Sequence, residues 1–230
     1  GKPYGAGEGT SVFAMDTGAG SSTIPNFDSG FPVDFAFEKT IAGGNSWSTG
    51  ARLIQNRYLY INTNTTESAW DKMVFDSNTG WNDHSSYGSG DQSWMWKRHA
   101  GLDVVTYVGN DTYFKNIPHS LGIAPEMMWL KYRGPSGFNE DWQVYHKGLN
   151  GGVNPQDYAI RLDSDGAEYN SSNDWNDTAP TSTHFTVGSD GRNNRNGSSY
   201  INILFASVAG ISKVGYYDGS DSSQTITTGF

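Results

Sequence analysis

The sequence predicts an all-β protein made of two tandem, homologous antiparallel β-sandwich domains of jelly-roll-like form. Three observations lead to this prediction. The 230-residue chain holds 29 Gly yet is 14% aromatic, with 8 Trp and 13 Tyr, which is typical of short strands joined by many turns around ring-rich cores. The stretch Gly101–Asn110 (GLDVVTYVGN) returns as Gly210–Gly219 (GISKVGYYDG), with a weaker copy at Ser11–Gly20. Finally, no window keeps helical periodicity over the about ten residues that a helix needs.

The first half contains a succession of strand signals. Val33–Glu38 alternates large apolar with small or charged residues, which is the period of a half-buried strand, so Val33, Phe35 and Phe37 are expected to face a core. Thr40–Asn45 predicts a turn because of its paired glycines. The other strands expected in this half are Ala51–Ile54, Arg57–Asn62 and Ser93–Lys97.

The second half repeats this pattern with other residues. Ile123–Lys131 (IAPEMMWLK) matches Phe31–Lys39 (FPVDFAFEK), and the offset drifts from 93 (125 − 32) at the prolines to 109 (210 − 101) at the glycines. A steady drift is what loop insertions in a duplicated domain produce. Glu38 and Glu126 are taken as repeat-equivalent, or nearly so, at strand positions, which suggests a structural role for both. Aromatic positions also correspond: Trp175 to Phe75, Phe185 to Trp81 and Phe205 to Trp96.

These repeats define the expected domain boundaries: 1–11 for a glycine-rich arm, 12–102 for the first repeat, 103–212 for the second and 213–230 for the start of a third. The last segment is expected to supply strands that close the second domain; the alternative is that the chain stops within a repeat. By the same logic Val104–Pro125 closes the first domain. Val12–Pro32 is then a strand pair with exposed edges for another chain or domain. Its expected assembly residues are Val12, Phe13, Phe27 and Phe31.

Charge and composition exclude several classes of function. Fifteen basic and 24 acidic residues give a net charge of −9, and no basic stripe stands out, so nucleic-acid binding is not expected. The chain has no Cys, which removes disulfides, zinc–thiolate sites and thiol nucleophiles. No apolar run approaches the roughly 18 residues of a membrane span, so membrane insertion is not expected either.

Five segments carry a recognisable pattern: Val104–Asn110 (VVTYVGN), Ile117–Arg133 (IPHSLGIAPEMMWLKYR), Trp142–Leu149 (WQVYHKGL), Trp175–Asp190 (WNDTAPTSTHFTVGSD) and Ser199–Ser220 (SYINILFASVAGISKVGYYDGS). Together they resemble a tandem β repeat of tailed-phage virion structural proteins. The repeat is familiar from tail-fibre-like proteins of marine and cyanobacterial phages, often beside a concanavalin-like jelly-roll domain. The resemblance covers essentially all of Val12–Phe230. It brings no catalytic or binding residues to this chain. It implies a virion or extracellular location, with copies of the chain or other virion proteins as partners.

Aromatic rings are the main candidates for ligand binding. A ring outside a core can stack on the apolar face of a sugar while neighbouring Asn, Asp and Ser bind its hydroxyls. Trp70, Trp142 and Trp175 lie among polar residues and are the candidate glycan-binding residues. The alternative is a packing role. Trp175 aligns with an aromatic residue of the other half, which suggests a core anchor, whereas Trp70 has no such counterpart.

One loop has the composition of a cation site. Asp163-Ser164-Asp165-Gly166 resembles the oxygen-rich loops that bind calcium, so Asp163 and Asp165 are candidate ligands and calcium is the one cofactor considered. The closing Glu of an EF-hand is missing, and simple turn formation is the alternative.

No catalytic residue is predicted. The five His show no metal-ligand spacing, and the Glu-x-Asp-x-Glu and Gly-x-Ser-x-Gly patterns of glycosidases and hydrolases are not found. The sequence therefore predicts a non-enzymatic virion structural protein, a tail fibre or other surface appendage or decoration, that assembles and presents loops to host-surface glycans. One alternative is a subunit of a non-phage extracellular filament assembled by strand pairing between protomers. Another is a polysaccharide-degrading enzyme, which needs a cleft with paired acids.

Overall fold

The structure is a computed structural model and describes residues 9–98, 101–135 and 137–228. Within these ranges nearly every regular element is a β-strand, all strand pairs are antiparallel, and the two α-helices have four residues each. The prediction of an all-β fold is therefore confirmed. None of the helices in these ranges has the length and apolar composition needed to cross a membrane.

The elements of the first half are η1 (Gly9–Ser11), β1 (Phe13–Thr17), β2 (Phe27–Asp28), β3 (Phe35–Thr40), β4 (Ser48–Ala51), η2 (Arg52–Ile54), β5 (Leu59–Tyr60), β6 (Met73–Val74), β7 (Gly80–Asp83) and β8 (Asp91–Trp96). Those of the second half are β9 (Leu102–Val108), β10 (Lys115–Pro118), β11 (Met127–Gly134), β12 (Gln143–His146), η3 (Leu149–Gly152), η4 (Pro155–Asp157), β13 (Tyr158–Arg161), β14 (Tyr169–Asn170), α1 (Ser172–Trp175), β15 (His184–Val187), α2 (Gly191–Asn194) and β16 (Ser199–Phe205).

The two large sheets have the same strand order. The first runs β1-β8-β3-β4-β5, and the second runs β9-β16-β11-β12-β13 with β14 added at its edge. Their registers also agree, because Trp96 lies between Phe13 and Phe35 as Phe205 lies between Leu102 and Met127. The offset between matched strands grows from 89 (102 − 13) to 109 (205 − 96). This correspondence supports an internal duplication.

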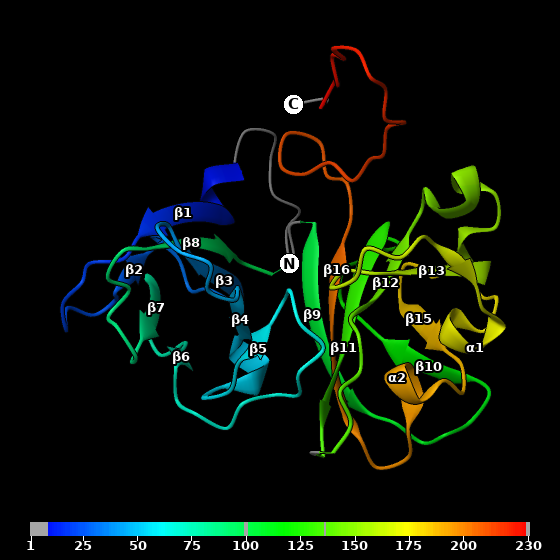
Figure 1. The fold of residues 1–230 in the computed structure, drawn as a ribbon, viewed down its shortest axis with the longest axis horizontal. Helices are drawn as coiled ribbons and strands as arrows, with labels where there is room; N and C mark the ends of the chain where they lie inside the picture. The colour runs from blue at the N-terminus through cyan, green and yellow to red at the C-terminus, as the bar shows by residue number, and fades with distance from the viewer. Residues whose placement is uncertain (1–8, 99–100, 136, 229–230) are drawn as a thin grey trace.

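Three hydrophobic cores lie between four layers of sheet (Figure 1). One core lies between the first large sheet and the small sheet β2-β7-β6, and it contains Phe27, Phe75 and Trp81. A second lies between the other large sheet and the pair β10-β15. The third joins the halves, because it combines Phe35 of β3 with Ile203 of β16. The two large sheets thus pack face to face.

Among the described residues no strand of one half pairs with a strand of the other, so the expected closure of the first domain by Val104–Pro125 is wrong. β9 pairs with β16 and β10 pairs with β15, all in the second half, while β1 pairs with β8 and β2 with β7 in the first. The similar stretches at 11–20 and 101–110 are the opening strands of each half, and each has a partner in its own half. Of the four expected assembly residues, Val12, Phe27 and Phe31 are consequently buried there, and Phe13 of β1 has 36% of its surface exposed.

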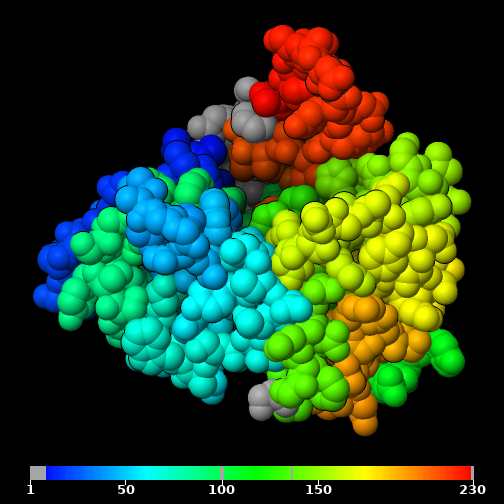
Figure 2. Space-filling model, viewed as in Figure 1, coloured from blue at the N-terminus to red at the C-terminus, as the bar shows by residue number. Residues whose placement is uncertain are grey.

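The expected closing strands of 213–230 are also not found in the described residues. After β16 the chain forms only the isolated bridge between Val208 and Ser212. The segment instead leaves the sheet and projects beyond both halves (Figure 2). It is held at its base by Tyr216, whose ring would lie 2.4 Å from a Cβ at Gly148, so Tyr216 packs directly on that glycine. In the expected arm 1–11, residues 1–8 lie outside the described residues.

One expected strand ends early. Ala51–Ile54 forms a strand only as far as Ala51, where β4 ends, and continues as η2. At this point the backbone NH of Arg52 donates to Asp34 O and its guanidinium donates to Val33 O. These contacts hold Arg52 against the segment that leads into β3.

Candidate functional site

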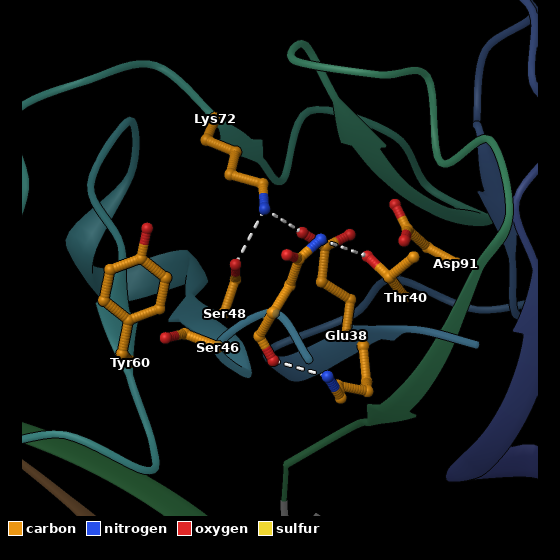
Figure 3. A pocket seen from close by; sticks show the side chains of 9 residues that line it. Glu38, Thr40, Ser46, Ser48, Tyr60, Lys72 and Asp91 are labelled. Atoms are coloured by element: carbon orange, nitrogen blue, oxygen red, sulfur yellow. Dashed lines mark hydrogen bonds and ion pairs between the residues drawn. The ribbon is translucent and has the colours of Figure 1, made fainter. Parts of the chain in front are cut away.

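The first half contains a polar pocket of about 260 Å³ between the β3–β4 hairpin and the segment that leads into β6 (Figure 3). Its lining offers carboxylate, ammonium, hydroxyl and amide groups together with one aromatic ring. The lining residues are Glu38, Lys39, Thr40, Asn45, Ser46, Ser48, Tyr60, Lys72 and Asp91. A pocket of this composition can bind a polar ligand through many hydrogen bonds.

Strand alternation places Glu38 inside this half of the molecule. On β3, Phe35 and Phe37 face the other large sheet, so Ala36 and Glu38 face the small sheet. Glu38 lies opposite Ser48 on β4 and Ser93 on β8. Both serines are small, and they leave room for a carboxylate between the layers.

Lys72 is the cation that contacts Glu38 in the pocket. Its Nζ lies 2.5 Å from Glu38 Oε1 and donates to Ser48 Oγ at 2.7 Å. The same ammonium lies 5.8 Å from the centre of the Tyr58 ring, within the range of a cation–π contact. Lys72 is therefore held at one side of the Glu38 carboxylate, and Figure 3 shows Asp91 beyond the other side.

Two aspartates complete the cluster, from two strands that are consecutive in the chain and belong to different sheets. Asp83 ends β7 and Asp91 begins β8, and together with Glu38 they place three carboxylate oxygens within 4.8 Å of one another. Asp83 is fully buried and accepts hydrogen bonds from the hydroxyls of Ser85 and Ser86. Burial opposes its ionisation, but these hydrogen bonds prevail and hold the pKa of Asp83 below its usual value.

The environment of the Glu38 carboxylate disfavours its ionised form. Burial raises its pKa from 4.5 to about 7; Asp83 and Asp91 add to the rise, and Lys72 opposes it. Its Oε2 is buried without a hydrogen-bond donor. Glu38 can therefore hold or release a proton near neutral pH, and it has an oxygen free for another ligand.

The second half has no such cluster at the matching positions. When the two halves are aligned by their strand registers, Leu130 takes the position of Glu38, Val187 that of Asp83 and Tyr200 that of Asp91. These three partners are fully buried members of one hydrophobic core. The same fold is therefore stable with apolar packing at these places, and the acids of the first half are an addition that the fold does not require.

The same registers correct the expected equivalence of Glu38 and Glu126. Glu126 matches Asp34, because the backbone NH of each residue donates to the last residue of the adjoining strand, Phe205 O and Trp96 O respectively. Glu126 pairs with Lys147 at 2.7 Å. The repeated acid is thus the Asp34/Glu126 position, and Glu38 has no acidic counterpart.

Two of the three expected glycan-binding tryptophans are buried. Trp142 is 0% exposed in the core between the halves, where its Nε1 donates to Tyr60 O at 2.9 Å. Trp175 is 1% exposed and packs against Tyr145 in the core of the second half. Neither ring can reach a glycan, so both predictions are wrong. Trp70 is 57% exposed, two residues before Lys72, and it stays a candidate.

The expected calcium ligands are not brought into an acidic cluster. Asp163 Oδ1 accepts from the backbone NH of Trp142 at 3.0 Å, and Asp165 is exposed on the following turn. In the described part of the chain, the one group of three or more candidate metal ligands is Glu38, Asp83 and Asp91. Asp163 thus has a clear structural role in orienting the start of β12.

Comparison with protein families identifies a matching domain model. The model described as "Domain of unknown function (DUF7483)" matches residues 82–230, which is more than half of the chain. The chain belongs to the DUF7483 family. No curated protein and no solved structure matches it.

The DUF7483 match spans the whole second half but only the end of the first. It includes Asp83 and Asp91 and leaves out Glu38, Ser48 and Lys72. The pocket of this DUF7483 protein is therefore built partly from residues outside the matched region.

Sequence reasoning missed Lys72, Asp83 and Asp91 altogether. A signal for the cluster was present in the ungapped alignment of FPVDFAFEK with IAPEMMWLK, which places Glu38 opposite Leu130. An acid that replaces an apolar residue on the inner face of a strand indicates a site. Lys72 had no comparable signal, because it lies in a segment without a matching strand in the second half.

Proposed function

We propose that this chain is a non-enzymatic structural module of a phage virion appendage, which binds host-surface glycans in the polar pocket of its first half. One observation carries the ligand-binding part: three acids, one of them paired with a lysine, stand beside a cavity, and the second half fills the positions of these acids with Leu130, Val187 and Tyr200. Buried charges weaken a fold unless they are paired. Their presence at this one place therefore favours binding over packing.

The chemistry of the pocket suits a carbohydrate. Sugar hydroxyls both donate and accept hydrogen bonds, and the pocket offers acceptors at Asp91, a donor at Lys39 and both kinds at Asn45. The Tyr60 ring provides an apolar surface in the same wall. Asn45, at the end of the exposed turn 41–45, lines the pocket, so the binding site would lie beside an exposed loop, as expected for attachment to a surface.

The absence of catalysis is part of the proposal. Glycoside hydrolysis uses two carboxyl groups on opposite sides of the scissile bond. Here the Lys72 ammonium contacts Oε1 of Glu38, and Asp83 is not among the residues that line the pocket where a glycan would lie. The virion location rests on the sequence resemblance of Val12–Phe230 alone.

Binding to an array of bacterial surface glycans tests this function. We expect the purified chain to bind a subset of glycans, and the double substitution Thr40→Ala with Asn45→Ala to weaken binding about tenfold, since two hydrogen-bonding groups of the rim are lost. Asn139→Ala, an exposed asparagine of the second half, is the matched control and should bind normally. Equal binding by the double variant and the control, or release of new reducing ends from a bound glycan, would contradict the proposal.

The filament alternative is favoured by one feature of β1. This strand is an open edge of its sheet, and its Phe13 and Met15 are 36% and 60% exposed, whereas the matching Leu102 and Val104 of β9 are buried. An open apolar edge can pair with a further chain. Analytical ultracentrifugation of Met15→Lys against the unchanged chain distinguishes the two: concentration-dependent oligomers that this substitution abolishes would support assembly through β1.

A further inference from the structure

The Glu38, Asp83 and Asp91 cluster is unusual because all three acids are buried. Glu38 is 2% exposed, Asp83 0% and Asp91 7%. They come from three strands of the first half, β3, β7 and β8. Their oxygens lie within 4.8 Å of one another. Carboxylates do not gather out of water at this spacing unless a proton or a cation lies among them.

A second observation points to a missing ligand. Glu38 Oε2 is buried and has no hydrogen-bond donor in the described structure. A buried acceptor without a partner is costly and rare. In Figure 3 the Glu38 carboxylate lies between Lys72 and Asp91, so the oxygen that does not face Lys72 is open toward the aspartates.

The charge of the cluster is unbalanced. Lys72 Nζ contacts Glu38 Oε1, and it is the one ammonium group with an ion pair to any of the three acids in the described structure. With all three carboxylates ionised, one positive charge against three leaves a net charge of −2. A divalent cation would neutralise the cluster without displacing Lys72, because the ammonium occupies a different oxygen.

The donor set identifies the class of cation. All the candidate ligand atoms are oxygens, and neither His nor Cys takes part. Hard cations prefer such ligands, and calcium in particular accepts irregular geometry at 2.3–2.6 Å, so two of its ligands can lie up to about 4.8 Å apart. The adjoining cavity of about 260 Å³ leaves room for water ligands.

We propose that Glu38, Asp83 and Asp91 form a binding site for one calcium ion at the base of the polar pocket. The internal duplication supports this assignment, because the second half fills the same three positions with Leu130, Val187 and Tyr200. The site itself is independent of glycan binding. Only its consequence, that the ion offers open coordination positions to sugar hydroxyls, rests on the proposed function.

Calorimetric titration of the metal-free chain with CaCl₂, without any glycan, tests the site. We expect one bound ion per chain and a higher melting temperature in calcium than in EDTA. Asp91→Asn should weaken binding about tenfold or more, because a direct ligand loses its charge. Glu126→Gln is the matched control, since Glu126 is paired with Lys147 in the second half, and it should bind calcium like the unchanged chain.

Glu38→Leu is a second test variant, chosen to separate the loss of calcium binding from a loss of folding. It installs the residue of the matching position, Leu130, so it is expected to keep the circular dichroism spectrum while losing calcium. No heat and no melting shift with CaCl₂ in the folded, unchanged chain would overturn the site, as would unchanged affinity in Asp91→Asn or tighter binding of MgCl₂ than of CaCl₂. Glycan binding that persists in EDTA would leave the proposed function standing while removing the role of the ion in it.

Discussion

Replacing Trp142 with alanine is expected to lower the free energy of unfolding by about 4 kcal/mol. The ring is fully buried in the core that joins the two large sheets, together with Leu59 of the first half and Ile201 of the second. The substitution leaves a large cavity there, and Tyr60 O loses the hydrogen bond that it accepts from Trp142 Nε1. An unpaired buried carbonyl adds to the cost of the cavity.

Urea denaturation followed by circular dichroism measures this change. Trp70→Ala is the matched control, because its ring is 57% exposed and exposed substitutions usually change stability by less than about 0.5 kcal/mol. If Trp142→Ala cost no more than the control, the face-to-face packing of the two sheets around Trp142 would be wrong.

Replacing Glu38 with glutamine is expected to change how stability depends on pH. Burial raises the pKa of Glu38 from 4.5 to about 7, so between these values the folded protein holds a proton that the unfolded chain releases. The stabilisation is fully present below pH 4.5 and is lost as the pH rises through about 7. A shift of this size corresponds to about 3 kcal/mol. Glutamine does not titrate, so the stability of the unchanged chain relative to Glu38→Gln should fall by that amount across this window.

The quantity to measure is the difference in free energy of unfolding between the unchanged chain and Glu38→Gln. His119 and His146, whose pKa values are lowered by burial, are present in both proteins, so their contributions cancel in this difference. Lys72, Asp83, Asp91 and Tyr60 face the site in both. Glu126→Gln is the control of opposite sign. Hydrogen bonds from Lys147 and Ser207 outweigh burial and lower the pKa of Glu126, so its stabilisation is present at high pH and is lost on acidification. A Glu38→Gln difference that stays flat from pH 4.5 to 7.5 would contradict the buried, poorly compensated carboxylate.

The fold could be predicted from the sequence wherever large rings recur at matching places. Phe185 and Trp81 are matched by the registers of β15 and β7, and Phe205 and Trp96 by those of β16 and β8. Alternation also identified Phe35 and Phe37, which face the core between the halves. Rings at such positions fix which side of a strand is buried, and this information is local to the sequence.

The placement of Trp142 and Trp175 could not be predicted in this way. Their polar neighbours in the sequence suggested exposure. In the structure, polar side chains contact the buried Trp142: Asp163 accepts from its backbone NH, and the Lys131 ammonium lies 5.8 Å from the centre of its ring. Those partners come from distant parts of the chain. Whether a polar neighbour marks solvent or a buried hydrogen bond is decided by tertiary packing, which the local pattern does not contain.

The candidate site was hidden for a related reason. Its acids are separated by 45 residues (83 − 38) and by 8 (91 − 83), and they meet only because β3, β7 and β8 belong to two packed sheets. A short sequence motif cannot reveal a cluster whose residues are so far apart in the chain. The expected equivalence of Glu38 with Glu126, an offset of 88 (126 − 38) instead of the 92 that the registers give (130 − 38), concealed the one comparison that singles out Glu38.

If the polar pocket of the first half is the ligand site, nuclear magnetic resonance of the ¹⁵N-labelled chain will locate it directly. On addition of CaCl₂, and then of the glycan that binds best on the array, we expect the largest amide shifts at Glu38, Thr40, Asn45, Lys72 and Asp91. The amides of the matching core positions, Leu130, Val187 and Tyr200, should stay unchanged. Shifts confined to the second half or to the C-terminal segment, with the pocket amides unmoved, would contradict the assignment of function to this pocket.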